Sequence, residues 1–315
     1  MRSYRLIAPA KINLTLGIVG NRSDGFHELV MVLQSIELAD LVTVSEIRGA
    51  EIRLTCDQAD VPLDETNLAW KAADLMRRKF PTVVAKHGGL AIDLQKFIPM
   101  GAGLAGGSAD CAAVLVGIDL LWELGLTQGE LQDLAALLGS DIPFCIAGGT
   151  ALATGRGEIL DPLPDLDNLY VVLAKYRDLP VPTPWAYKTY RAQFGHTYPK
   201  TPEDLEARTQ AMRSSQMMAA IAHRDPIAIG QNLYNDLERV VLPKYPQVQA
   251  LRDRFAALGG LGTLMSGSGS TVFALAESLE KAELIRHHMR SMFPDENLEL
   301  WVTKFSASGV RLAQG

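Results

Sequence analysis

A glycine-rich stretch at residues 99–110 constrains the fold of this chain more than any other feature of its sequence. The residues before it, 90–95, alternate between apolar and polar side chains, which predicts a strand. After it, apolar residues recur at helical spacing without proline, which predicts a helix over about 109–124. The glycines therefore join a strand to the N-terminus of a buried helix, where backbone N–H groups lack intrahelical partners. Such a loop is expected to bind an anion, most often phosphate.

Two well-known phosphate-binding motifs do not explain this loop. Gly101, Gly103 and Gly106 have the spacing of the dinucleotide fingerprint, but that fold needs a parallel strand carrying an acidic residue after the helix. Here the helix leads instead into another helix that begins at Thr127. The P-loop pattern fails because Gly107 stands where that motif has lysine. A glycine-rich turn that binds no ligand is the remaining alternative.

Length and composition limit the class of protein. A chain of 315 residues with 48% hydrophobic residues suggests about two domains with substantial cores. The net charge of −6 argues against nucleic acid or an anionic membrane as a partner. The three scattered cysteines imply neither a disulfide framework nor a metal site, and they fit a reduced, cytoplasmic compartment. The sequence contains neither a signal-peptide core nor an apolar run long enough to span a membrane.

The pattern of the first half predicts a β-rich start. Strands are expected at 4–16 (interrupted at 9–11), 28–35, 41–47 and 52–54. A helix is expected at 67–80, with Thr66 as its cap and Pro81 as its stop. A second helix at 128–138 and a hairpin around 155–157 follow the glycine-rich loop.

The second half is predicted to begin after a domain boundary at Pro162 and Pro164. Its pattern indicates a strand at 169–174, helices between 203 and 258, and a second glycine–serine turn at 266–270. A strand at 271–276, a helix at 278–292 and a strand at 298–303 complete the prediction.

A few polar residues could carry chemistry. Lys11 lies between two apolar halves of a strand, so its ammonium must reach water or pair with an acid. Asp141 precedes the apolar residues 142–146 and is either a partly desolvated carboxylate or a helix N-cap. Asn13 and His27, taken alone, could equally be an amide that satisfies a turn and a half-buried histidine.

Three segments together resemble the motifs of the galactokinase–homoserine kinase–mevalonate kinase–phosphomevalonate kinase (GHMP) superfamily. Residues 99–109 resemble its phosphate-binding motif, 265–270 its C-terminal glycine-rich motif, and 8–14 its N-terminal motif. Their order and spacing agree over the whole chain. Two departures are Ala105, where glycine is more usual, and Ala109, where serine is frequent, which leaves Ser108 as the only hydroxyl of the motif.

The resemblance implies a two-domain α+β fold. The N-terminal domain, expected at 1–162, would be a ribosomal S5 domain 2-like α/β domain with a left-handed βαβ unit that binds ATP. The C-terminal domain, expected at 163–315, would be of ferredoxin-like α+β type and bind the substrate. ATP, accompanied by Mg²⁺ with few protein ligands, would lie between them. The residues implied to bind ATP are Pro99, Met100, Gly101, Ala102, Gly103, Leu104, Ala105, Gly106, Gly107, Ser108 and Ala109.

Further segments narrow the resemblance within the superfamily. Residues 22–27, 139–144, 182–184 and 235–238 are most similar to members of the non-mevalonate isoprenoid pathway. These members phosphorylate a hydroxyl of a cytidine diphosphate-linked methylerythritol, giving the 2-phosphate. The residues implied to bind that small-molecule substrate are Asn13, Phe26, His27, Thr183, Pro184, Tyr187, Ser266, Gly267 and Ser268.

The expected chemistry is direct phosphoryl transfer from ATP. Asp141 is the candidate base for the substrate hydroxyl, and Lys11 is its charge partner. The cytosine is expected to stack between Phe26 and Tyr187, with Trp185 as the alternative second ring and His27 at the edge of the base. Two other functions stay open: a mevalonate- or homoserine-type kinase, and a nucleotide sensor without turnover.

Overall fold

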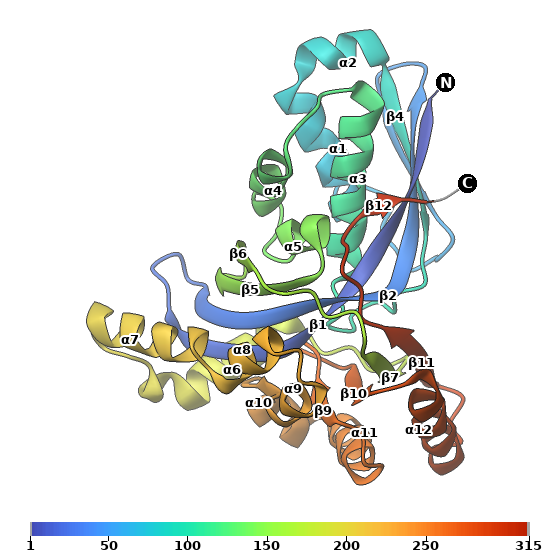
Figure 1. The fold of residues 1–315 in the computed structure, drawn as a ribbon. Helices are drawn as coiled ribbons and strands as arrows, with labels where there is room; N and C mark the ends of the chain where they lie inside the picture. Colours follow the sequence, from blue (N-terminus) through green and yellow to red (C-terminus); the bar gives the residue numbers. More distant parts are fainter. Residues whose placement is uncertain (1, 314–315) are drawn as a thin grey trace.

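Two long antiparallel strands, β1 (Ser3–Asn21) and β2 (His27–Ile47), form the centre of the computed structural model, which describes residues 2–313 (Figure 1). The predicted interruption of the first strand at 9–11 is wrong. The chain passes through it as a β-bulge, with a register shift between Pro9 and Lys11, and a bulge is a place where proline is tolerated.

The strands predicted at 28–35 and 41–47 are one continuous strand, β2. In its central segment, Ile36 forms a β-bridge with Phe305, and Leu38 N–H donates a hydrogen bond of 2.9 Å to Thr303 Oγ1, on a strand near the end of the chain. These partners are remote in sequence, so local patterning could not reveal the continuity.

Within residues 2–313, the first sheet has eight strands. It runs in the order β12-β1-β2-β4-β3, with β5 and β6 continuing from β2 and β8 beside β1, where β8 is Tyr234–Asn235 and β12 is Arg311–Leu312. β3 (Ile52–Cys56) is parallel to β4 (Gly89–Gln95). The crossover between them contains α1 (Leu68–Lys79) and α2 (Pro81–His87). The left-handedness expected of this unit stays a prediction. β5 (Thr150–Gly155) and β6 (Ile159–Pro162) form the predicted hairpin.

The predicted cap of the first helix is wrong by one residue. Asn67, not Thr66, is the N-cap, because its Oδ1 accepts a hydrogen bond of 2.8 Å from Ala69 N–H. Pro81 begins α2 rather than only ending α1, since proline suits the first position of a helix.

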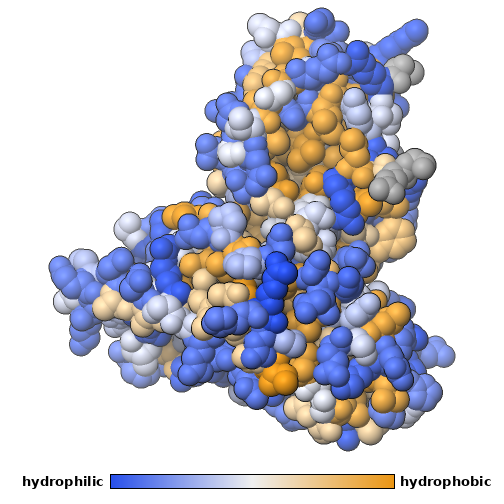
Figure 2. Space-filling model, viewed as in Figure 1, coloured by the Kyte–Doolittle hydropathy of each residue, from blue (hydrophilic) through white to orange (hydrophobic). Residues whose placement is uncertain are grey.

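Helices cover one face of the first sheet. α3 (Gly106–Trp122) packs on β1, β2 and α1, and it begins three residues earlier than predicted because the last glycines of the loop are already helical. α4 (Gln128–Ala136) and α5 (Ile142–Ala147) follow it. Figure 2 shows apolar side chains gathered over α1 and α3, whereas the surface around α7 (Pro202–Arg213), which has no buried residues, is mainly hydrophilic.

The second sheet has four antiparallel strands in the order β11-β7-β10-β9. Its strands are β7 (Tyr170–Tyr176), β9 (Gly262–Met265), β10 (Val272–Ala276) and β11 (Leu298–Lys304). α11 (Pro246–Ala257) and α12 (Leu279–Met292) pack on it. In chain order this is a βαββαβ arrangement, the ferredoxin-like unit that the resemblance implied.

The remaining elements lie between β7 and β9 in the chain, except for β12 near its end. They are α6 (Thr183–Phe194), the 3₁₀ turn η1 (Gly195–Thr197), α8 (Gln216–Ala222), α9 (Pro226–Gln231), β8 (Tyr234–Asn235), α10 (Glu238–Lys244) and β12 (Arg311–Leu312). β8 and β12 belong to the second half of the sequence but pair with β1. The domain boundary after residue 162 stays a prediction. No helix within residues 2–313 has both the length and the apolar content needed to cross a membrane.

Candidate active site

A cavity of about 1180 Å³ lies where the glycine-rich loop, the middle of β1, the start of α5, the β1–β2 turn, the start of α6 and the glycine–serine turn at 266–270 meet. A typical pocket for one small ligand measures about 300–1,000 Å³. The cavity is therefore larger than the usual pocket for one small ligand.

The glycine-rich loop is fixed between β1 and the second glycine–serine turn. Leu104 O accepts a backbone hydrogen bond of 3.1 Å from Lys11 N–H, and Gly103 O accepts one of 3.0 Å from Ser266 Oγ. Gly103 has φ +73°, and a Cβ at this position would lie 2.1 Å from Ser266 O. Only glycine therefore allows this approach of the two loops.

The N-terminus of α3 points its amide groups at the cavity. No side chain caps this end, and Gly106, Gly107 and Ser108 of its first turn line the cavity. Unpaired N–H groups and the helix dipole make such an end a site for phosphate. The preceding residue, Ala105, adopts φ +59°, a left-handed conformation that is unfavourable for alanine.

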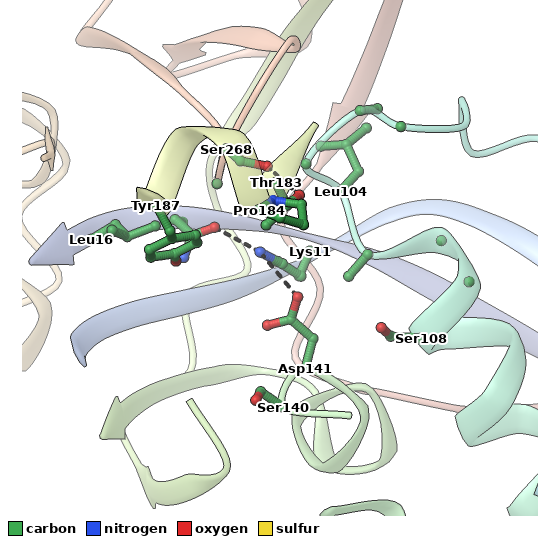
Figure 3. A pocket seen from close by; sticks show the side chains of 18 of the residues that line it. Lys11, Leu16, Leu104, Ser108, Ser140, Asp141, Thr183, Pro184, Tyr187 and Ser268 are labelled. Atoms are coloured by element: carbon green, nitrogen blue, oxygen red, sulfur yellow. Dashed lines mark hydrogen bonds and ion pairs between the residues drawn. The ribbon is translucent and has the colours of Figure 1, made fainter. Parts of the chain in front are cut away.

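Lys11 and Asp141 face each other in the middle of the cavity (Figure 3). Lys11 Nζ lies 3.7 Å from Asp141 Oδ2 and donates a hydrogen bond of 2.7 Å to Asn13 Oδ1. Asp141 occupies the N-cap position of α5, but its side chain makes no capping hydrogen bond. The carboxylate is 33% exposed, so it is held by charge and remains accessible to a substrate.

The predicted ATP-binding residues lie on one side of this pair. Every residue from Pro99 to Ser108 lines the cavity, whereas Ala109 is fully buried behind it. The predicted substrate residues Thr183 and Pro184, at the start of α6, also line the cavity, as do Gly267 and Ser268 of the turn that packs against Gly103, and the hydroxyls of Thr183 and Ser268 are 2.7 Å apart. Ser266 does not line it and instead joins the two loops.

The aromatic residues of the predicted cytosine site converge around Tyr187 of α6. The ring of Tyr187 lies 5.1 Å from that of His27, and both residues line the cavity together with Phe26, which is 53% exposed. Trp185 packs edge-on against Tyr245 and is not among the lining residues of the described chain. Of the two alternatives, Tyr187 is therefore the ring that reaches the cavity.

His27 is neutral in this setting. Burial, together with the nearby charge of Arg191, lowers the pKa of His27 to about 4. Its Nε2 atom is buried and has no hydrogen-bond partner within residues 2–313. A neutral imidazole offers one donor and one acceptor, which suits the polar edge of a base.

Sequence reasoning missed a buried ionic cluster at the other end of the cavity. Lys96 lines the cavity and contacts the carboxylates of Asp40 and Asp110, and at most 6% of each of the three side chains is exposed. Burial raises the pKa of Asp110 to about 7, although the Lys96 ammonium acts in the opposite direction. We call this cluster the Lys96 triad. Nothing in the sequence signals it, because its members belong to three different elements.

Three further cations of the cavity were also missed, namely Arg156, Lys188 and Arg191. With Lys11 and Lys96 they oppose a single acidic lining residue, Asp141, in a chain whose net charge is −6. The cavity is therefore locally positive and suits polyanionic ligands. The glycines on both sides of Arg156 were the one signal that could have drawn attention to it.

The donor set of the cavity fits a metal ion carried by phosphates rather than one held by the protein. Residues 2–313 contain no cluster of three or more histidine, cysteine, aspartate or glutamate side chains able to hold a metal. Among the lining residues, Ser108 carries a hydroxyl in the first turn of α3, and Asp141 carries a carboxylate at the start of α5. Mg²⁺ typically binds in this way, through one or two protein oxygens and the phosphates.

Comparison with known proteins agrees with this geometry. Residues 67–149 match the GHMP kinases N terminal domain, and residues 217–295 match the GHMP kinases C terminal domain. A 4-diphosphocytidyl-2-C-methyl-D-erythritol kinase of Acaryochloris marina (strain MBIC 11017) is 60% identical over 312 residues, covering 99% of each chain. The enzyme with the same name from Nostoc punctiforme (strain ATCC 29133 / PCC 73102) is 59% identical over 313 residues, again covering 99% of each.

Solved structures agree as well. The crystal structure of a 4-(cytidine 5'-diphospho)-2C-methyl-D-erythritol kinase has a TM-score of 0.72 and 32% identity, covering 96% of this chain and 99% of that one. A homoserine kinase from Cytophaga hutchinsonii ATCC 33406 has the same TM-score at 22% identity, covering 99% and 98%, and so shares the fold. By these matches over nearly its whole length, the chain belongs to the GHMP kinases and, within them, to the 4-diphosphocytidyl-2-C-methyl-D-erythritol kinases.

Proposed function

We propose that this chain transfers the γ-phosphoryl group of ATP to a hydroxyl of 4-diphosphocytidyl-2-C-methyl-D-erythritol, giving the 2-phosphate. The observation that carries the proposal is the Lys11–Asp141 pair, 3.7 Å apart, between a phosphate-binding loop and an aromatic pocket. A nucleotide sensor of the same fold without catalytic activity would not need this accessible carboxylate. A cytoplasmic location for the activity stays a prediction.

Each group of the site has a role in the transfer. The amides of the loop and of the α3 N-terminus hold the phosphates in place. Asp141 accepts the proton of the attacking hydroxyl, and Lys11 balances charge on the carboxylate and on the transferred group. Asn13 holds the Lys11 ammonium through its 2.7 Å hydrogen bond. Mg²⁺, bound with ATP, would offset phosphate charge, with Ser108 within the loop as a protein donor.

The cytidine end of the substrate is assigned to the aromatic side of the cavity. Phe26 and Tyr187 supply two flat faces, and stacking on each is worth roughly 1–3 kcal/mol. His27, neutral because of its lowered pKa, faces the edge of the base. Thr183, Pro184, Gly267 and Ser268 line the cavity as well.

A coupled ADP-release assay tests the proposal. The purified chain is given ATP with the cytidine-linked methylerythritol, with mevalonate, or with homoserine. We expect turnover of the first alone. Equal turnover of all three, or of none, would remove the assignment.

Competition by CMP tests the cytidine site separately. CMP should compete with the cytidine substrate and leave ATP binding unaffected, and Phe26→Ala and Tyr187→Ala should weaken substrate binding while ATP affinity holds. Competition between CMP and ATP for one site would contradict the assignment of the aromatic side.

A further inference from the structure

Arg156 lines the cavity but has no part in the mechanism above. It forms the tip of the hairpin between β5 and β6, and its guanidinium carbon lies 5.2 Å from the centroid of the Phe26 ring. This is the geometry of a cation–π contact. Because the Phe26 ring is 53% exposed, it can hold this cation and still offer surface to a ligand.

The hairpin tip is built to hold Arg156 in this place. Glu158 Oε2 accepts a hydrogen bond of 2.6 Å from Arg156 N–H, and Glu158 Oε1 lies 3.5 Å from Arg156 Nε. Gly157 has φ +111°, and a Cβ added to it would lie 2.7 Å from Met31 Cε and 3.8 Å from Ser140 Cβ. The tip therefore lies between Phe26 and the residue that precedes Asp141.

The guanidinium still has donors available. Within residues 2–313, its two terminal amino groups make no hydrogen bond, and its ion pair with Glu158 is formed at Nε, 3.5 Å from Oε1. Arg191, a neighbouring cation, is engaged differently, since its Nη2 donates a hydrogen bond of 2.7 Å to Gly25 O. Arg156 thus presents a fork of donors to the cavity, and such a fork matches the oxygens of a phosphate.

We propose that Arg156 is a specificity-determining residue that binds the diphosphate of the cytidine substrate while its guanidinium stays stacked on Phe26. The inference rests on the proposed function. In that function the cytosine lies at Phe26 and the reacting hydroxyl at Asp141, so the diphosphate that joins them spans the region between. The tip of the hairpin occupies that same interval.

Steady-state kinetics of three variants test this role. Arg156→Gln should raise KM for the cytidine substrate about tenfold, the size of one charge-assisted contact, and leave kcat and KM for ATP within about twofold. Arg156→Lys should recover part of the loss because it retains the charge. Arg177→Gln is the matched control, since Arg177 is an exposed arginine paired with Glu299 outside the cavity, and it should behave as wild type.

Calorimetry with CDP and with cytidine distinguishes two roles of Arg156. One is contact with the diphosphate, and the other is only positioning of the Phe26 ring. Arg156→Gln should weaken CDP binding about tenfold and cytidine binding less than twofold. Unchanged CDP affinity, or equal losses for CDP and cytidine, would overturn the inference. If the wild-type chain fails to phosphorylate the cytidine substrate, the proposed function falls, while the comparison of CDP with cytidine still decides the role of Arg156.

Discussion

Lys11 and Lys96 line the same cavity and both face aspartate carboxylates, yet the two clusters are built for different tasks. Lys11 lies 3.7 Å from one carboxylate that is 33% exposed. Lys96 lies between two carboxylates, those of Asp40 and Asp110, which are at most 5% exposed. An accessible carboxylate can exchange a proton with a substrate, whereas carboxylates sealed around a lysine cannot. The first cluster should therefore control rate and the second stability.

The Lys96 triad is suited to fixing the glycine-rich loop. Asp40 Oδ1 accepts hydrogen bonds of 2.6 and 2.8 Å from Phe97 N–H and Ile98 N–H, immediately before the loop. Asp110 lies in α3, immediately after it. Lys96 therefore joins the two ends of the loop through one buried ammonium.

The largest effect is expected for Asp141→Asn. The amide is similar in size but cannot accept the proton, so turnover should fall by roughly 10²–10⁴ while the melting temperature and ATP affinity stay near those of wild type. The ADP-release assay and a thermal melt measure the two quantities. Asp161→Asn, at an exposed ion pair with Arg213, is the control for the same chemical change. Wild-type turnover in Asp141→Asn would end the assignment of the base.

Lys96→Met, unlike Asp141→Asn, should mainly lower the free energy of unfolding. It leaves two buried carboxylates without their counter-ion, and removing one partner of such a cluster costs about 3–5 kcal/mol. Urea denaturation should report this loss in the free energy of unfolding. A variant that unfolds like wild type and loses only activity would show that Lys96 acts as Lys11 does.

Lys11→Met should lose rate more than stability, in contrast to Lys96→Met. Because Asp141 remains partly solvated, the main loss is the buried hydrogen bond to Asn13, and the free energy of unfolding should fall by about 1–3 kcal/mol, less than for Lys96→Met. The rate should fall by about 10²–10³, the usual effect of removing one group that stabilises transition-state charge. Urea denaturation measures the first quantity and the ADP-release assay measures the second. Full activity in Lys11→Met would contradict its role as charge partner.

The raised pKa of Asp110 should make the free energy of unfolding depend on pH. Its folded-state pKa, about 7, is above its ordinary value of 3.8, so the folded state binds the proton more tightly. This contribution is fully present below about pH 4, decreases as pH rises, and is lost above about pH 7. Denaturation of wild type and Asp110→Asn between pH 4 and pH 8 isolates it. The wild-type advantage in unfolding free energy should decrease across that window, and a constant or rising difference would contradict the prediction.

The sequence predicted the Lys11 cluster and not the Lys96 triad for a physical reason. Lys11 and Asp141 belong to motifs with recognisable local patterns. The triad depends on the pairing of β2 with β4, in which Leu41 lies opposite Gln95 and so brings Asp40 beside Lys96. Alternation of apolar and polar residues indicated both strands, but register between strands distant in sequence is set by tertiary packing.

Tertiary packing also explains the other differences between the predicted and the observed structure. Most strands and helices were predicted to within a few residues, since each has a clear periodic pattern. The middle of β2 bonds to Thr303, and the placement of Arg156 beside Phe26 depends on the path of the β5–β6 hairpin. These are contacts between segments far apart in the chain, so no local pattern encodes them.

The smallest effect is expected for Ala105→Gly, in the loop between the two clusters. Lys11 N–H bonds to Leu104 O on one side of this residue, and Lys96 Nζ would lie 3.5 Å from a Cβ at Gly106 on the other. Ala105 has φ +59°, which costs an alanine about 1–2 kcal/mol, while glycine offsets part of that gain through its greater unfolded-state entropy.

Ala105→Gly should therefore raise the free energy of unfolding by about 0.5–1 kcal/mol, measured by urea denaturation, with little change in turnover. Gly129→Ala, at an open helical position, is a control for the general effect of exchanging these two residues. If the clusters fix the loop independently of this residue, only stability should respond. A change in rate comparable to that of Lys11→Met would show instead that the strained conformation of Ala105 positions the reacting groups.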